Sequence, residues 1–206
     1  MNLIYLDHGA TTPLDPEVAA GLAERQITLF GNPGSTHPPG RAAAHALEAA
    51  RASLARSLGA SRPDEVVFTS GGTESLGLAL LGGATAPGSR VAVSAVEHSA
   101  VWEAARWLAQ HRGFTIDEIP VDAAGFVQPA ALEGRLHRET RLVAIMLANN
   151  ELGTLNDLPA LAARVRAAAP RARLVVDAVQ AFGKIPFSVA GLGADHVAVA
   201  AHKLHG

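Results

Sequence analysis

A lysine stands between two histidines in the segment AAHKLHG, residues 200–206. Only two of the 17 basic lysine and arginine side chains are lysines, Lys184 and Lys203, and the others are arginines. Arginine stays protonated, whereas a lysine amine can lose its proton and add to a carbonyl carbon. We therefore expect Lys203 to perform covalent chemistry that an arginine could not.

The segment SGGTES, residues 70–75, lies between an apolar run and a helical pattern. The amide of Gly72 and the hydroxyl of Thr73, at the positive end of a helix, would suit a phosphate group. Ser or Thr followed by Glu also describes ordinary helix capping, so both interpretations stay open. The sequence has neither a G-x-G-x-x-G motif nor a P-loop, which argues against a nucleotide site.

Other polar side chains follow apolar runs. Asp177 should be partly desolvated and should pair with a cation, which a protonated ring nitrogen or an arginine could supply. His98 could stack on a planar ligand or move protons, or it could simply hydrogen-bond to the backbone. Asn149, Asn150 and Gln180 could bind a ligand or serve as turn residues.

These groups match the needs of pyridoxal 5'-phosphate when they are taken together. The cofactor requires an amine for its aldehyde, an anion site for its phosphate, a carboxylate for its ring nitrogen and a partner for its ring face. Each signal is weak alone, and their combination predicts this cofactor.

Short β-branched runs alternate with Ala, Leu and Arg-rich stretches of helical period, which predicts an α/β domain with a mostly parallel sheet. We expect strands at residues 65–70, 90–96, 114–120, 141–147, 173–179 and 196–201. We expect helices at residues 41–58, 74–83, 99–111, 129–136 and 157–168. The Gly- and Pro-rich segment 30–41 should be an ordered surface loop. Because ligands gather at the carboxyl ends of parallel strands, the polar residues there should share one site.

Composition excludes several classes of protein. The chain has 206 residues, 49% of them hydrophobic, enough for a substantial core. Its net charge of −2 gives nothing to neutralise a row of phosphates, so we expect no nucleic acid partner. Apolar runs are too short for membrane spans and the N-terminus lacks a signal pattern, so we expect a cytoplasmic protein. His196, His202 and His205 lack a known metal-binding spacing, and we expect no metal.

Several segments in order along the chain resemble the cysteine desulfurases of the class V aminotransferase family. They are YLDHGATTP (5–13), GNPGSTHPPGR (31–41), VVFTSGGTES (66–75), VEHSAV (96–101), NNELGT (149–154), VDAVQAFGKIP (176–186) and AAHKLHG (200–206). The resemblance implies the large domain of the PLP-dependent transferase fold type I, with a mostly parallel sheet flanked by helices. We expect an N-terminal arm at residues 1–15 and a large domain at 16–206, without the small C-terminal domain.

The resemblance also implies residue roles. Lys203 would form the bond to the cofactor aldehyde, His98 would stack on the ring and move a proton, and Asp177 would pair with the ring nitrogen. The other implied cofactor contacts are Gly72, Thr73 and His202 at the phosphate, and Asn150 and Gln180 near the phenolic oxygen. Lys184 matches a family lysine that carries no cofactor. Ala200 departs from the family, because many relatives have a phosphate-binding serine there.

The family takes sulfur from L-cysteine, leaves alanine, and passes the sulfur through a loop cysteine to an acceptor protein, for example in iron–sulfur cluster assembly. Its members are homodimers. This chain has no cysteine, and we expect it to be an N-terminal portion that is inactive alone. The alternatives are a selenocysteine lyase, another class V lyase, or a non-catalytic remnant that acts as a binding partner.

Overall fold

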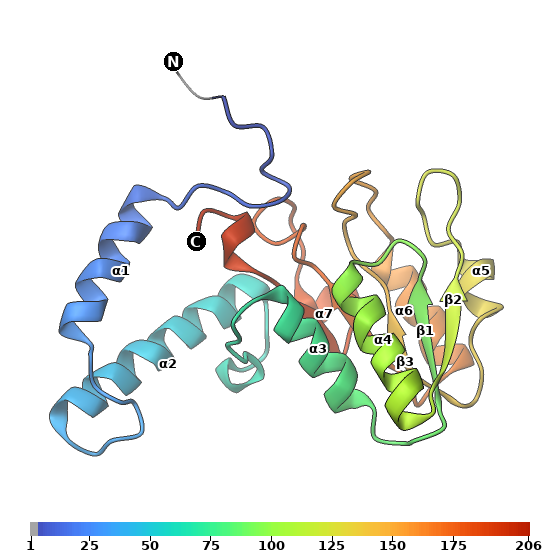
Figure 1. Ribbon diagram of the computed structural model, residues 1–206, viewed down its shortest axis with the longest axis horizontal. Helices are drawn as coiled ribbons and strands as arrows, with labels where there is room; N and C mark the ends of the chain where they lie inside the picture. The colour runs from blue at the N-terminus through green and yellow to red at the C-terminus, as the bar shows by residue number, and fades with distance from the viewer. Residues whose placement is uncertain (1–3) are drawn as a thin grey trace. The chain divides into compact units, whose positions relative to one another are not determined.

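The structure is a computed structural model that describes residues 4–206, and it divides into two compact units. The larger unit comprises Thr69–Phe187 and Gly191–Ala200. The smaller unit comprises the residues up to Phe68 together with Ser188–Ala190 and Ala201–Gly206. Figure 1 shows the elements of both units along the chain.

A five-stranded sheet forms the centre of the larger unit, and every strand pairs in parallel with its neighbours. The strands are β1 (Arg90–Ser94), β2 (Thr115–Ile119), β3 (Thr140–Ala144), β4 (Arg173–Asp177) and β5 (His196–Ala198). Their spatial order is β2-β1-β3-β4-β5. The expected α/β fold with a parallel sheet is therefore confirmed.

Alternation of side chains along the strands creates a hydrophobic core on each face of this sheet. Val91 and Val93 of β1 pack on one face, and Ala92 between them packs on the other. Helices α3 (Gly72–Gly83) and α4 (Ser99–Arg112) cover the first face. Helices α5 (Pro129–Glu133) and α6 (Leu158–Ala168) cover the second, as Figure 1 shows.

The smaller unit contains α1 (Pro16–Thr28), α2 (Pro38–Leu58) and the short 3-10 turns η1 (Pro63–Glu65) and η2 (Ala201–Lys203). A short helix, α7 (Val189–Leu192), adds Leu192 to the core of the larger unit. Gly40, in the first turn of α2, lies against the preceding loop, because a Cβ on Gly40 would lie 2.4 Å from the Ser35 carbonyl oxygen. Across residues 4–206, no helix combines the length and the apolar character needed to cross a membrane.

Residues 65–70 do not form the expected strand, so the sheet has five strands instead of six. The carbonyl of Val66 accepts a hydrogen bond from the Arg51 guanidinium. In a sheet, that carbonyl would accept a hydrogen bond from the backbone of a neighbouring strand. Val67 is 64% exposed, and the ring of Phe68 lies 4.9 Å beneath the Arg51 guanidinium carbon. The prediction of a strand at residues 65–70 is therefore wrong, and part of this apolar run faces solvent.

Helix α1 was not among the expected helices, although its start carries a recognisable signal. Asp15 caps the helix by accepting hydrogen bonds from the amides of Glu17, at 2.8 Å, and Val18, at 3.4 Å. Pro16 follows at the first helical position, where its missing N–H does no harm. None of the residues of α1 is buried, so the apolar stripe that usually reveals a helix was weak.

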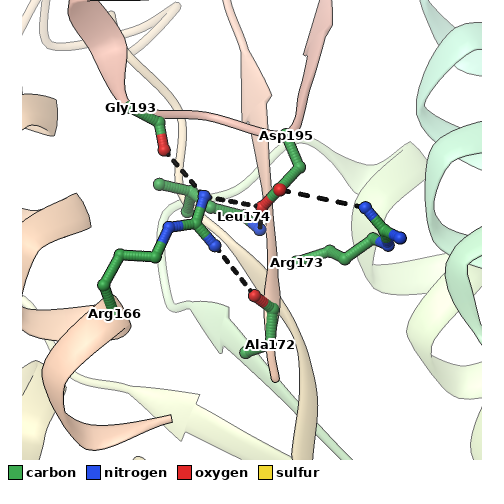
Figure 2. A network of polar contacts seen from close by, with 6 residues as sticks. All are labelled: Arg166, Ala172, Arg173, Leu174, Gly193 and Asp195. Carbon is green, nitrogen blue, oxygen red and sulfur yellow. Dashed lines mark hydrogen bonds and ion pairs between the residues drawn. The ribbon is translucent and has the colours of Figure 1, made fainter. Parts of the chain in front are cut away.

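A polar network ties together the amino-terminal ends of β4 and β5 (Figure 2). Asp195 accepts hydrogen bonds from the Leu174 amide, at 2.7 Å, and from the Arg166 guanidinium, at 2.8 Å. The same guanidinium donates to the carbonyls of Gly193 and Ala172, at 2.9 and 3.0 Å. One carboxylate and one guanidinium thus satisfy three backbone groups where two strands begin.

Removing the Asp195 carboxylate should destabilise the larger unit, because the Leu174 amide and the Arg166 guanidinium would both lose an acceptor. We expect Asp195→Ala to lower the free energy of unfolding by about 1–3 kcal/mol in urea titrations. Asp64→Ala removes an exposed carboxylate and should change that free energy by less than about 0.5 kcal/mol. Equal effects of the two variants would show that the network contributes nothing specific.

Candidate active site

The connections after β1 and β3 leave the sheet in opposite directions, because β1 continues to β2 on one side and β3 to β4 on the other. Ligands of open parallel sheets bind at such a point, beyond the carboxyl ends of the strands. A cavity of about 540 Å³ lies here and is lined by residues 95–99 after β1 and residues 149–152 after β3. It therefore contains two of the expected site residues, His98 and Asn150.

His98 lies in the cavity wall as the N-cap of α4. Its Nδ1 accepts a hydrogen bond from the Ala100 amide at 3.1 Å. A neutral imidazole that accepts at Nδ1 carries its hydrogen on Nε2, and His98 is an exposed residue. The backbone interaction and a position at the cavity are thus compatible.

Asn149 joins the two loops that line the cavity. Its Oδ1 accepts hydrogen bonds from the amides of Glu151, at 2.9 Å, and Leu152, at 2.8 Å. Its Nδ2 donates to the Val96 carbonyl at 3.3 Å. The turn-residue interpretation therefore applies to Asn149, whereas its neighbour Asn150 is exposed and lines the cavity.

Asp177 ends β4 with a carboxylate that is buried, at 6% exposure. Its Oδ1 accepts a hydrogen bond from the Val179 amide at 2.9 Å, and its own carbonyl accepts one from the Leu147 amide at 2.9 Å. Gln180 follows in the same turn, and its Oε1 accepts a hydrogen bond from the Lys184 amine at 2.8 Å. Lys184 thus has the polar partner that suits a structural lysine.

The start of α3 offers backbone amides without a side-chain cap. Gly71 is the N-cap residue, and no heavy atom lies within 4 Å of the place where its Cβ would stand. Glu74 accepts a hydrogen bond from the Ser70 amide at 2.5 Å, and hydrogen bonds to Ser70 lower the pKa of Glu74. Thr73 is exposed in this first turn. Both a capping contact and open space for an anion are therefore present.

Ala200 lies beside the same helix start. A Cβ on Gly72 would come 3.8 Å from the Ala200 Cβ and 3.1 Å from the Val179 Cγ2. Ala200 itself is buried, at 6% exposure. Residue 200 therefore faces the first turn of α3, and it places a methyl group where a serine would place a hydroxyl.

Lys203 and His202 belong to the smaller unit, whereas the other expected site residues belong to the larger unit. Both lie in η2, which follows Ala200 directly in the chain. The His202 carbonyl accepts a hydrogen bond from the Thr12 amide at 2.9 Å. The Nδ1 atom of the His202 ring lies 3.2 Å from the Thr11 hydroxyl oxygen. Among residues 4–206, no three His, Cys, Asp or Glu side chains come together as a metal site.

Glu97 is a buried acid in the cavity wall to which the sequence analysis gave no role. It is 8% exposed, and its Oε1 accepts a hydrogen bond from the Met146 amide at 2.6 Å. Its Oε2 is buried without a hydrogen-bond partner among residues 4–206. Burial, and the negative charge of Asp177, raise the pKa of Glu97 to about 8, against the lowering effect of the Met146 amide. Burial thus favours the protonated form of Glu97.

The fold and the cavity define an open α/β domain with a cavity at the switch point of a parallel sheet, where ligands of such sheets commonly bind. The family model described as aminotransferase class-V matches residues 4–206. The chain therefore belongs to the class-V aminotransferase family, whose enzymes in general depend on pyridoxal 5'-phosphate.

Similar proteins with curated names or solved structures are consistent with membership of this family. The chain is 42% identical over 206 residues to the cysteine desulfurase IscS of Dictyoglomus turgidum, a match that covers 98% of this chain and 51% of the relative. A solved structure titled NifS-like protein superimposes with a TM-score of 0.91 at 36% identity and covers 98% of this chain and 56% of that one. Another solved structure, titled SspA in complex with cysteine, has a TM-score of 0.89 at 28% identity. That match covers 98% of this chain and 58% of the SspA chain. The chain spans about half the length of the curated relatives it matches.

The buried acid makes stability depend on pH in a defined direction. The pKa of Glu97 is about 8 in the folded chain, against 4.5 as its ordinary value, so the folded state binds more protons between these values. The free energy of unfolding should therefore fall as pH rises from about 4.5 to 8, by up to ~1.4 kcal/mol per pH unit from this group.

The side chain of Glu97→Gln is neutral at every pH, so this variant should lose the part of the pH dependence of the free energy of unfolding that comes from Glu97. At pH 8 the variant should therefore have a higher free energy of unfolding than the parent chain. Urea titrations at a series of pH values measure the difference between the two proteins. The matched control is Glu103→Gln on an exposed turn of α4, which should keep the parent slope. Identical slopes for the parent and Glu97→Gln would show that Glu97 is ionised in the folded chain.

Proposed function

We propose that this chain forms the cofactor-binding part of a pyridoxal-phosphate-dependent cysteine desulfurase. The observation that carries the proposal is the cavity at the β1/β3 switch point, which has His98 and Asn150 in its wall. Buried Asp177 ends β4, next to β3 in the sheet. Curated relatives named cysteine desulfurase and a solved relative titled as a complex with cysteine support the substrate class.

The chemistry of the side chains in the larger unit fits the cofactor. A buried carboxylate at Asp177 suits a protonated ring nitrogen, because a desolvated negative charge requires a cationic partner. The uncapped amides after Gly71 suit a phosphate group, and Thr73 adds a hydroxyl in the same turn. Asn150 and Gln180 provide amide groups for the phenolic oxygen.

In this proposal each residue has a defined task. Pyridoxal 5'-phosphate, when bound, supplies an electron sink for the substrate bond that breaks. Lys203 provides the amine that holds the cofactor aldehyde, and His202 contacts the phosphate. His98 would stack on the ring and would move a proton with Nε2, because its Nδ1 accepts the N-cap hydrogen bond. Asp177 keeps the proton on the ring nitrogen.

The sulfur-transfer half of the reaction needs a thiol that these 206 residues do not contain. We expect the intact protein to take sulfur from L-cysteine, to act as a homodimer and to pass the sulfur to an acceptor protein. The 206-residue chain alone should therefore produce little or no sulfide and alanine from cysteine. Turnover at ordinary enzyme rates by this chain would contradict this expectation.

Substitution of Lys203 tests the cofactor bond directly. The parent chain mixed with pyridoxal 5'-phosphate should show the visible absorbance of a lysine–aldehyde imine, and borohydride should fix the cofactor to Lys203 in peptide mass spectra. Lys203→Ala should abolish both signals because no other amine is in the proposed role. The control Lys184→Ala should keep both. Equal signals in parent and Lys203→Ala would favour a remnant without cofactor chemistry.

Ala200 offers a test in which binding improves. Ala200→Ser places a hydroxyl beside the first turn of α3, where it can donate a hydrogen bond to the phosphate. We expect the dissociation constant of pyridoxal 5'-phosphate to fall by about five- to tenfold, the effect of one charge-assisted hydrogen bond. Pyridoxal without phosphate should show no such gain. An equal gain for both compounds would mean that residue 200 does not face the phosphate.

A further inference from the structure

A short segment near the N-terminus contacts the backbone on both sides of Lys203. The Thr12 amide and hydroxyl both donate to the His202 carbonyl, at 2.9 and 3.0 Å. The same hydroxyl accepts a hydrogen bond from the His205 amide at 2.7 Å. Thr12 therefore binds the residue before Lys203 and the second residue after it.

Neighbours of Thr12 extend this contact into a bracket, defined here as residues 11–15. The Thr11 hydroxyl donates to the His202 carbonyl at 3.2 Å, and the Asp15 amide donates to the His205 carbonyl at 3.0 Å. The His205 Nδ1 lies 2.9 Å from the Pro13 carbonyl, which accepts its hydrogen. Because Asp15 also caps α1, the bracket is attached to a regular element at its far end.

The backbone inside the bracket has an uncommon conformation. His205 has a φ of 65°, and it is the only non-glycine residue with positive φ among residues 4–206. Such a conformation is disfavoured for a residue with a side chain and persists where surrounding contacts impose it. Here those contacts come from Thr12, Pro13 and Asp15.

We propose that Thr12 is a positioning residue that fixes the backbone around Lys203 before the cofactor arrives, an inference that rests on the proposed function of Lys203. Its hydroxyl can donate to one carbonyl and accept from one amide at once, so a single side chain sets both flanks of the lysine. A backbone held in this way needs no further ordering when the amine meets an aldehyde.

Two substitutions separate the hydroxyl from the shape of the side chain. Thr12→Val keeps the branched shape and removes the hydroxyl, whereas Thr12→Ser keeps the hydroxyl. The matched control is Thr28→Val, because the Thr28 hydroxyl donates to the Glu24 carbonyl within α1 at 2.9 Å. Circular dichroism checks that each variant of the 206-residue chain is folded.

The first readout needs no cofactor. Hydrogen exchange of the His205 amide, followed by NMR, should become about fivefold faster in Thr12→Val, because that amide loses its acceptor. In Thr12→Ser and Thr28→Val the rate should stay within about twofold of the parent rate. An unchanged rate in Thr12→Val would overturn the proposal.

The second readout is binding of pyridoxal 5'-phosphate, with borohydride trapping at Lys203. The dissociation constant should rise about five- to tenfold in Thr12→Val and return to within about twofold of the parent value in Thr12→Ser. Faster exchange at His205 with unchanged binding would also overturn the proposal, because the bracket would then form without positioning the lysine.

A parent chain that shows no Lys203-dependent binding would contradict the proposed function, and a separate measurement then decides the positioning role. Brief acetylation compares Lys203 with Lys184, which is the only other lysine and serves as an internal reference. Thr12→Val should change the Lys203-to-Lys184 labelling ratio by at least about twofold, whereas Thr12→Ser should not. An unchanged ratio in Thr12→Val overturns the positioning role.

Discussion

The parallel pairing of β1 with both β2 and β3 determines where chemistry can occur in the larger unit. Parallel strands bring their carboxyl ends to one edge of the sheet. The connection after β1 leads to one side and the connection after β3 to the other, which leaves an opening at that edge between them. The loops that line the opening are then held by specific contacts, such as Glu97 with the Met146 amide and Asn149 with the Val96 carbonyl. Contacts between the loops that follow β1 and β3 thus hold the wall of the cavity.

The two edges of the sheet use polar groups differently. At the amino-terminal edge, Asp195 and Arg166 satisfy backbone groups of neighbouring segments, and their side chains are occupied by that task. At the carboxyl edge, the Glu97 Oε2 is buried and no group in the described part of the chain hydrogen-bonds to it; within that part no side chain caps α3. Polar groups at the amino-terminal edge thus connect backbone segments, whereas polar groups at the carboxyl edge lie around the cavity.

Local sequence patterns predicted most of this architecture, and the failures have physical reasons. The runs around β1 to β5 were recognised because buried parallel strands are rich in β-branched residues. The run 65–70 has a similar composition, but its Val66 carbonyl and Phe68 ring contact Arg51, and this contact between distant residues has no local pattern. Glu97 was overlooked as a buried acid because its partner, the Met146 amide, lies 49 residues away. The contact of Thr12 with His202 spans 190 residues and has no local signature.

The hydrogen bond between Lys184 and Gln180 bears on selectivity among amines. A reactive aldehyde condenses with accessible primary amines, and on many protein surfaces lysines are numerous competitors. Here 15 of the 17 lysine and arginine side chains are arginines, and the Lys184 amine donates a hydrogen bond to the Gln180 side chain. Carbonyl compounds thus meet few lysine amines on this chain, because arginine supplies most of its positive charge.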